Sequence, residues 1–269
     1  MVTAKSIMAY TFFLLISINI IKGQDSPLAQ EYMRLAEDFK KNLNRDSAII
    51  YYEKASVGYQ KLGDIEKFIN AYNQIGIILT RQDKYEAANT YLEKTLSMGL
   101  SSLDTNNLVI ATTYISLGVI YNAEEKYDQS LIYHNKALAI RLAKLGEFHG
   151  EVATSYGNLG NVYRNNNEFD KSIEAHLKAM KIREMVFGLT SAEIVESYVG
   201  LGNAYKQKRE YNNALEYFEK ALKNKIIQYG EGHKNLIKFY KYVSDIYYLM
   251  DKKTKGDEYK IKWEDIERK

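Results

Sequence analysis

The amino-acid sequence predicts an all-α protein, an α-solenoid of about six consecutive helix pairs. Three observations support this: the 269 residues include a single proline, a small residue recurs about every 42 positions, and apolar residues at helical spacing surround it. A fixed period of this length is typical of solenoids, in which each unit packs only against its neighbours. Within one array over 24–269, the units are expected at about residues 29–64, 69–104, 111–146, 153–188, 195–230 and 237–269.

Residues 1–23 are expected to precede the array as a signal peptide. Lys5 lies before fifteen uncharged residues at positions 7–21, which is the charge and hydropathy pattern of a secretory leader. Gly23 offers a small residue at a cleavage site. The alternative is an uncleaved membrane anchor through residues 7–21, although this segment is short for a full bilayer span.

The first helix of each pair is predicted from a stripe of positions around the recurring small residue. In all six copies a tyrosine lies four residues before it, an aliphatic residue lies one before it, and a large apolar residue lies three after it. These offsets share one face of a helix, and the small residue lets a neighbouring helix approach closely. The small residues are Ala36, Gly76, Gly118, Gly160, Gly202 and Ser244, and the tyrosines are Tyr32, Tyr72, Tyr114, Tyr156, Tyr198 and Tyr240.

The second helix of each pair is predicted from another series of small residues, twelve positions after the first, with bulky residues between them. Alternating small and large side chains suit interdigitation with the first helix. Glycines that follow these helices are expected to cap them in the left-handed conformation. The small residues are Ala48, Ala88, Ser130, Ser172, Ala214 and Gly256, and the capping glycines are Gly63, Gly99, Gly146, Gly188 and Gly230.

The composition is unusually rich in tyrosine, with 24 tyrosines against nine phenylalanines and one tryptophan. Most of the tyrosines fall on the periodic positions of the two helices. We therefore expect them to pack between helices rather than to form an aromatic binding surface.

Segments such as TSYGNLGNVY and ESYVGLGNAY resemble the tetratricopeptide repeat family, whose signature places an aromatic residue, Leu-Gly, Tyr and Ala at these offsets. The 42-residue spacing is similar to the kinesin-light-chain subtype, in which a Gly-x-x-His-Pro turn joins the pairs. Residues 146–149 (GEFH) and 230–233 (GEGH) match that turn, and Gly150 and Lys234 stand where its proline would be. The resemblance implies a right-handed superhelix with degenerate first and last copies.

The composition also excludes several kinds of site. The chain has no cysteine, which removes disulfides, thiolate nucleophiles and cysteine-bound metals. The net charge of +3 is too balanced for a dedicated nucleic-acid binder. His134 and His176 share one repeat position and are interpreted as packing residues, whereas His149 and His233 share a turn position. The sequence therefore predicts no catalytic site, no metal and no cofactor, and the chain is expected not to be an enzyme.

Binding is expected on the concave surface, which the first helices of a helical solenoid line. Asparagine offers a donor and an acceptor to the amide of an extended peptide, and arginine or lysine adds a preference for acidic segments. The resemblance implies that Asn158 holds the place of an asparagine that kinesin-light-chain-like repeats direct toward bound peptide. The candidate peptide-binding residues are Asn73, Arg81, Asn122, Asn158, Asn161, Arg164, Asn165, Asn203 and Lys206.

These features predict a non-enzymatic, exported interaction scaffold, periplasmic or secreted, whose partner is a mildly acidic peptide or protein. Neither nucleic acid nor, after signal cleavage, a membrane is an expected partner. The alternative function is a sensory or regulatory arm of a bacterial signalling system. Such an arm would act through a separate or missing output domain, such as a histidine kinase, a DNA-binding domain or a caspase-like protease.

Overall fold

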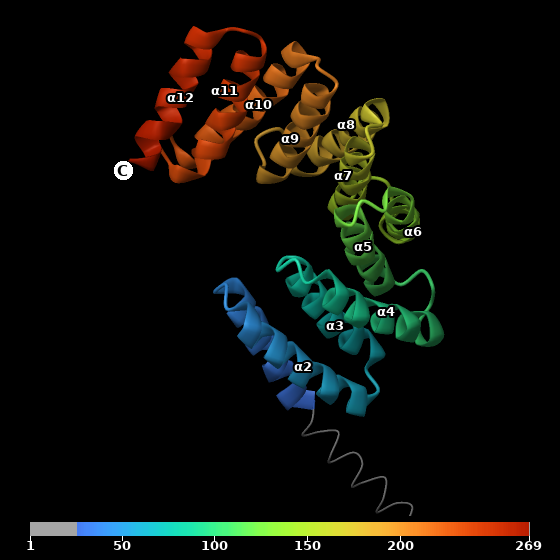
Figure 1. Cartoon of the computed structure of the whole chain (residues 1–269). Coiled ribbons are helices and arrows are strands. Elements are labelled where there is room, and N and C mark those ends of the chain that lie inside the picture. Colours follow the sequence, from blue (N-terminus) through green and yellow to red (C-terminus); the bar gives the residue numbers. More distant parts are fainter. Residues whose placement is uncertain (1–25, 269) are drawn as a thin grey trace, which may run out of the picture. The chain divides into compact units, whose positions relative to one another are not determined.

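The computed structural model describes residues 26–268, so the predicted signal peptide or anchor at residues 1–23 lies outside the described part. The described chain is a succession of helices joined by short turns (Figure 1), and the all-α prediction is confirmed for it. After a helix over residues 26–41, the elements are α2 (Arg45–Leu62), α3 (Ile65–Thr80), α4 (Tyr85–Ser102), α5 (Leu108–Ala123), α6 (Tyr127–Leu145), α7 (Gly150–Asn165), α8 (Phe169–Phe187), α9 (Ala192–Gln207), α10 (Tyr211–Tyr229), the 3₁₀ turn η1 (Lys234–Leu236), α11 (Ile237–Leu249) and α12 (Lys253–Glu267).

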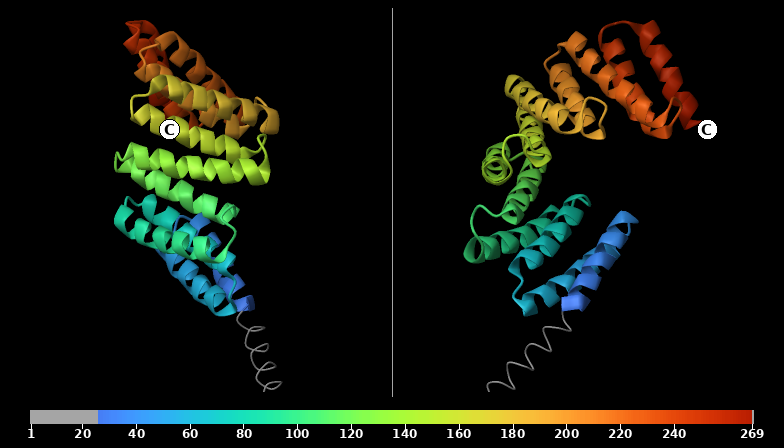
Figure 2. Two further views of the ribbon diagram at one scale, coloured as in Figure 1. Left: turned by 90° about the vertical axis from the view of Figure 1, so that its right-hand side faces the viewer. Right: turned by 180° about the vertical axis from the view of Figure 1, so that it is seen from behind.

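The helices divide into two compact units, with the boundary between Ile120 and Tyr121. In the first unit, α3 packs against both α2 and α4. In the second unit, each helix from α6 onward packs against the next one in sequence, and α7 also contacts α9 (Figure 2). The odd-numbered helices from α3 are therefore the first helices of their pairs, and the even-numbered helices are the second.

The recurring small residue of the first helix lies against a large residue of the second helix in the same pair. A Cβ atom added to Gly76 would lie 2.6 Å from Cδ2 of Leu92, and one added to Gly202 would lie 2.6 Å from Cε1 of Phe218. Contacts this short leave no room for a methyl group, so the two helices approach as closely as the sequence pattern predicts.

Tyrosines pack between the two helices of a pair, which confirms their expected role. The rings of Tyr205 and Tyr217 stack with centroids 5.7 Å apart and an interplanar angle of 5°. Tyr121 and Tyr133 form the same stack two pairs earlier, at 5.3 Å and 3°. Offset-stacked rings bury a large apolar area and add a modest geometric preference.

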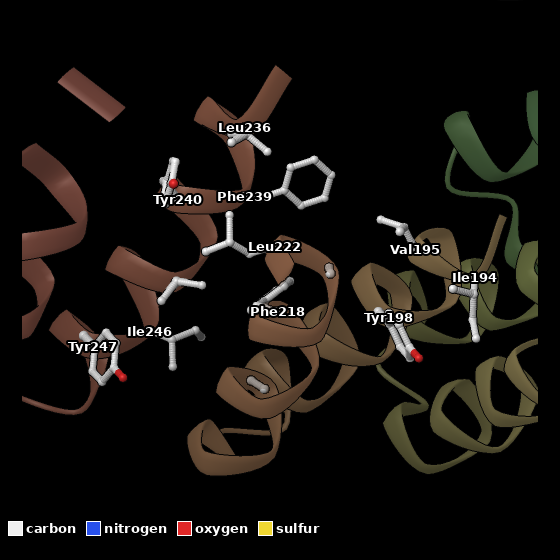
Figure 3. Close-up of a cluster of buried hydrophobic side chains, with 13 residues drawn as sticks. Ile194, Val195, Tyr198, Phe218, Leu222, Leu236, Phe239, Tyr240, Ile246 and Tyr247 are labelled. Atoms are coloured by element: carbon white, nitrogen blue, oxygen red, sulfur yellow. The ribbon is translucent and has the colours of Figure 1, made fainter. Parts of the chain in front are cut away.

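The largest cluster of buried side chains in the second unit joins α9, α10, η1 and α11 (Figure 3). Phe218 of α10 lies near its centre, with Leu222 on the same helix and Phe239 and Ile246 contributed by α11. Residues of this size contribute about 1.5–3 kcal/mol each when fully buried. This cluster fixes α9 relative to α11, and both helices bound the pocket described below.

The turns within the pairs share a backbone feature that the sequence analysis did not predict. One residue in each turn has a positive φ of 57–65°, although none of these residues is a glycine. This conformation is uncommon for residues with a Cβ atom and costs about 1–2 kcal/mol. The residues are Leu43, Asp83, Glu125, Asn167, Arg209 and Asp251.

The turns between the pairs follow the glycine prediction in part. Gly63 caps α2 in the left-handed conformation, with φ 71° and ψ 17°. Gly146, Gly188 and Gly230 also have positive φ, but their ψ values of 158–171° are extended. Gly99 does not cap a helix, because α4 continues to Ser102. The prediction was wrong at this position because Gly99 serves packing: a Cβ atom there would lie 3.1 Å from Ile110.

We expect Gly202→Ala to lower the free energy of unfolding by about 1–3 kcal/mol, because the added methyl group overlaps the buried Phe218 ring. Gly157→Ala is the matched control, since its Cβ atom would lie 3.9 Å from the nearest atoms, those of Arg183. Replacing this helical glycine should raise stability by up to about 1 kcal/mol. Urea unfolding followed by circular dichroism measures both changes, and equal stability of the two variants would contradict the packing argument.

Candidate functional site

Three first helices of the second unit, α7, α9 and α11, border a pocket of about 520 Å³, which we name the α7/α9 pocket. Four of the nine candidate residues line it: Asn158, Asn161 and Arg164 on α7, and Asn203 on α9. The three α7 residues share one face because they lie three residues apart along a helix. The structure thus brings these four candidates together.

The amide groups of Asn158, Asn161 and Asn203 are available to a ligand. Each side chain is half-buried in the pocket wall. None of the three makes a hydrogen bond to another residue within 26–268. Each amide therefore keeps both its donor and its acceptor for a bound molecule.

Arg183 of α8 lies at the floor of the pocket and is only 4% exposed. Its Nη1 donates to Oγ of Ser197 at 2.8 Å, and its Nη2 donates to Oε2 of Glu196 at 2.6 Å. Burial lowers the pKa of Arg183 and Glu196 opposes that shift, yet a guanidinium group stays protonated in proteins. Gly157 of α7 lies beside this guanidinium group, since an added Cβ atom would be 3.9 Å from both Nη atoms.

Arg141 makes the same contact one repeat earlier, outside this pocket. Its Nη1 donates to Oγ of Ser155 at 2.9 Å, and its Nε lies 3.2 Å from Oε2 of Glu151. The contact therefore ties the second helix of one pair to the first helix of the next. Arg141 and Arg183 thus make the same contact between successive pairs, and Arg183 in addition lines the α7/α9 pocket.

Arg164 lies between the α7/α9 pocket and a second hollow of about 610 Å³, the turn pocket. Its Nη2 donates to Oδ1 of Asn165 at 3.2 Å, whereas its buried Nε has no partner among the described residues. Burial lowers the pKa of Arg164. Asn165 and Asn122 line the turn pocket and are joined by a hydrogen bond of 3.1 Å.

His176 of α8 lies behind the amide face and is 2% exposed. A Cβ atom on Gly160 would lie 2.7 Å from its Nε2, and one on Gly200 would lie 2.5 Å from its Nδ1. The ring is thus enclosed between α7 and α9, and neither nitrogen has a hydrogen-bond partner among residues 26–268. Burial, together with Arg164 and Arg183, lowers the pKa of His176 to about 3, so the ring is neutral at neutral pH.

From its repeat position His176 was expected to be a packing residue, and its burial confirms this. Neither His176 nor Arg183 was expected to line a pocket. Two features of the sequence point to these residues. Positions 157 and 200 are glycines where the other copies have bulkier residues, and Arg183 lies 42 residues after Arg141. The turn histidines also lie where expected, since Nδ1 of His149 caps α7 by accepting from the backbone N–H of Glu151.

Asn73 does not lie on an exposed face, which corrects the sequence-based expectation. It is 0% exposed. Its Nδ2 donates to the backbone oxygen of Val109 at 3.2 Å, and its Oδ1 accepts from Oγ1 of Thr113 at 2.9 Å. The Asn73 side chain faces the next helix pair instead of solvent, so its amide joins α3 to α5.

The other candidates lie apart from the α7/α9 pocket. Arg81 is exposed at the C-terminal end of α3, in the first unit. Lys206 is half-buried, with its Nζ 3.6 Å from Oδ2 of Asp245. The assignment of these residues, and of Asn122 and Asn165, to peptide binding stays a prediction.

The described residues contain neither a candidate metal-ion site nor a candidate membrane-spanning helix. Within 26–268, no three His, Asp or Glu side chains converge in a way that could hold a metal ion. In the same part of the chain, no helix combines the length and the apolar character that crossing a bilayer requires.

Acidification from pH 7 to pH 5 should destabilise the protein through its two buried histidines. Burial and the neighbouring Arg141 lower the pKa of His134 to about 4, and that of His176 is about 3. Both values lie below about 6.5, the pKa of an unfolded histidine. The unfolded state therefore binds more protons in this range, and stability falls by about 2 kcal/mol per histidine.

Urea unfolding at pH 7 and pH 5 checks this expectation. The double variant His134→Phe/His176→Phe should lose most of the pH dependence, because phenylalanine does not titrate. Phenylalanine fits at this repeat position, because Phe218 occupies the equivalent place in the pair after His176. An unfolding midpoint of the natural chain that is unchanged between the two pH values would contradict the burial argument.

Known structures share this arrangement of helices. BtubC (BKLC) from P. vanneervenii aligns with a TM-score of 0.68 and 15% identity, over 91% of this chain and 91% of that one. A Podosopora anserina putative kinesin light chain with nearly identical repeats aligns with a TM-score of 0.60 and 15% identity, over 74% and 96%. Aspartyl phosphate phosphatase F from Bacillus subtilis aligns with a TM-score of 0.63 and 15% identity, over 90% and 60%. At these identities, the similarity shows the fold alone.

Sequence comparison gives the family. No curated protein matches the chain. The tetratricopeptide repeat family matches at residues 67–143, 109–185 and 151–227, and these overlapping segments span more than half of the 269 residues. The expected resemblance is thereby confirmed at the level of the family, and structures similar to the chain include kinesin-light-chain repeats. The chain belongs to the tetratricopeptide repeat family.

Proposed function

We propose that the chain is a non-enzymatic interaction scaffold that binds an extended segment of a partner protein in the α7/α9 pocket. The observation that carries this proposal is the set of three unpaired amides, Asn158, Asn161 and Asn203, on facing first helices. By contrast, the buried amide of Asn73 is paired through both its nitrogen and its oxygen, with Val109 and Thr113. Amides that stabilise nothing inside the protein are placed to bind something outside it.

An extended peptide matches the chemistry of this wall. Each peptide unit presents one N–H and one C=O, and an asparagine side chain pairs with both. Val195, Val199 and Phe239 provide an apolar part of the pocket that suits the side chains of the bound segment. The volume of about 520 Å³ lies within the range of about 300–1,000 Å³ that is typical of ligand pockets.

The triple variant Asn158→Ala/Asn161→Ala/Asn203→Ala tests the amide wall. A random peptide library displayed on phage, selected against residues 24–269, supplies the probe peptides. Each neutral hydrogen bond contributes about 1 kcal/mol net, so loss of three should weaken binding about 100-fold. Isothermal titration calorimetry measures the affinity, and the helical circular dichroism signal should not change, because these amides form no internal hydrogen bonds.

The matched control is Asn42→Ala/Asn135→Ala/Asn235→Ala, which removes three exposed amides outside the pocket. It should bind the selected peptides as the natural chain does. The proposal is overturned if no peptide is enriched, or if both triple variants bind equally well.

We also propose that the chain is exported, on the basis of Lys5 and the uncharged segment at positions 7–21. Expression of the full chain in a bacterial host, followed by fractionation, should place it outside the cytoplasm with Gln24 as its first residue. Leu14→Arg/Leu15→Arg interrupts the apolar segment and should hold the chain in the cytoplasm. Recovery in the membrane fraction with Met1 retained would instead support an anchor, and recovery of the natural chain in the cytoplasm would contradict export.

A further inference from the structure

The α7/α9 pocket carries more positive than negative charge. Four cationic side chains line it, from four different helices: Arg164 of α7, Arg183 of α8, Lys225 of α10 and Lys238 of α11. Glu196 is the one acidic residue among the lining side chains. Its side chain is 70% exposed and already paired with Arg183. Charges that line a concave pocket interact more strongly than charges on an open surface.

His176 provides an independent indication of a ligand. Its two ring nitrogens are buried and unpaired among the described residues. A buried polar atom without a partner is destabilising and calls for an explanation. Packing does not provide one, because Phe218 fills the equivalent place in the next pair, against Gly202, without any polar atom. The imidazole ring therefore offers hydrogen bonding that the fold itself does not use.

The two guanidinium groups line the same pocket as this imidazole. Burial, together with Arg164 and Arg183, lowers the pKa of His176, so the ring is neutral and carries one N–H that can donate to a ligand. Arg164 has a buried Nε without a partner in the described part of the chain. Arg183 is held in place by Ser197 and Glu196 and lines the pocket beside Gly157. The unpaired Nε of Arg164, together with the fixed positive charge of Arg183, suits an acceptor with negative charge.

We propose that the floor of the α7/α9 pocket is a carboxylate subsite, in which Arg164 and Arg183 supply the positive charge and the N–H of His176 supplies a further donor. The carboxylate comes from an acidic side chain of the bound segment, and in this respect the inference rests on the proposed function. A free dicarboxylate has the same chemistry and is distinguished by the experiment.

The experiment uses the peptides selected on the natural chain. We expect them to carry Asp or Glu at one fixed position, and its change to Asn or Gln should lower affinity at least ~10-fold, as charge-assisted pairs are about twice as strong as neutral ones. In Arg183→Met, the same peptide change should have little further effect. Arg141→Met is the matched control, because it loses the same bond to a serine but lies outside the pocket.

A second variant removes the imidazole chemistry and keeps the packing. His176→Phe should weaken binding of the acidic peptide more than binding of its Asn or Gln counterpart, whereas His134→Phe, at the equivalent position one repeat earlier, should alter neither. Succinate is the free-anion probe. If succinate binds and displaces the acidic peptide, the subsite also accepts free dicarboxylates. If it binds and no peptide is enriched, the subsite is retained and the peptide source is rejected.

The remaining outcomes separate the two proposals. Enriched peptides without a fixed acidic position overturn the subsite and leave peptide binding intact. Equal losses in Arg183→Met and Arg141→Met, with no difference between His176→Phe and His134→Phe, do the same. If neither peptides nor succinate bind the natural chain, both proposals fail.

Discussion

The close approach of the two helices in each pair is the constraint on which the rest of the structure depends. A glycine on the first helix admits a large side chain of the second, as Gly76 admits Leu92 and Gly202 admits Phe218. Because this contact recurs, the helices within each unit stack in sequence order. The pocket follows from this stacking. It lies between the first helices α7 and α9, and α8, the second helix between them in sequence, also lines it.

Joints between successive pairs and the binding site share side chains. Arg141 and Arg183 each reach from a second helix to a serine on the following first helix. Arg183 also lines the α7/α9 pocket, where Gly157 lies beside its guanidinium group. A contact that stabilises two of the joints thus also contributes a charged group to the pocket at one of them. Part of the positive charge of the pocket therefore comes from a residue, Arg183, that also holds two helix pairs together.

The fold could be predicted from the sequence because its determinants are local and repeated. Small residues at fixed spacing, tyrosines at helical offsets and polar turns all recur, so errors at single positions do not change the result. Gly99 illustrates the limit: its place after a predicted helix suggested a cap, but contacts with Ile69 and Ile110 decide its role. The left-handed residues of the turns were not predicted, because Leu43 and Arg209 have no local preference for that conformation.

The site could be predicted only in part. Asn158, Asn161, Arg164 and Asn203 lie together because helical periodicity places them on facing surfaces. Asn73 has the same residue type, but the direction of its side chain depends on how α3 meets α5. Arg183 and His176 come from the second helix, and their access to the pocket depends on glycines in two other helices. Side-chain direction across three elements is a tertiary property that a one-dimensional pattern does not contain.

The equivalence of His176 and Phe218 has a consequence for how such arrays acquire specificity. The two residues fill the same space against the same kind of glycine, so exchanging one for the other changes hydrogen-bonding capacity while the stacking geometry stays the same. This interior position of the second helix can therefore differ in chemistry from one copy to the next. Because His176 also lines the α7/α9 pocket, such an exchange alters the chemistry of the pocket through a residue of the helix packing.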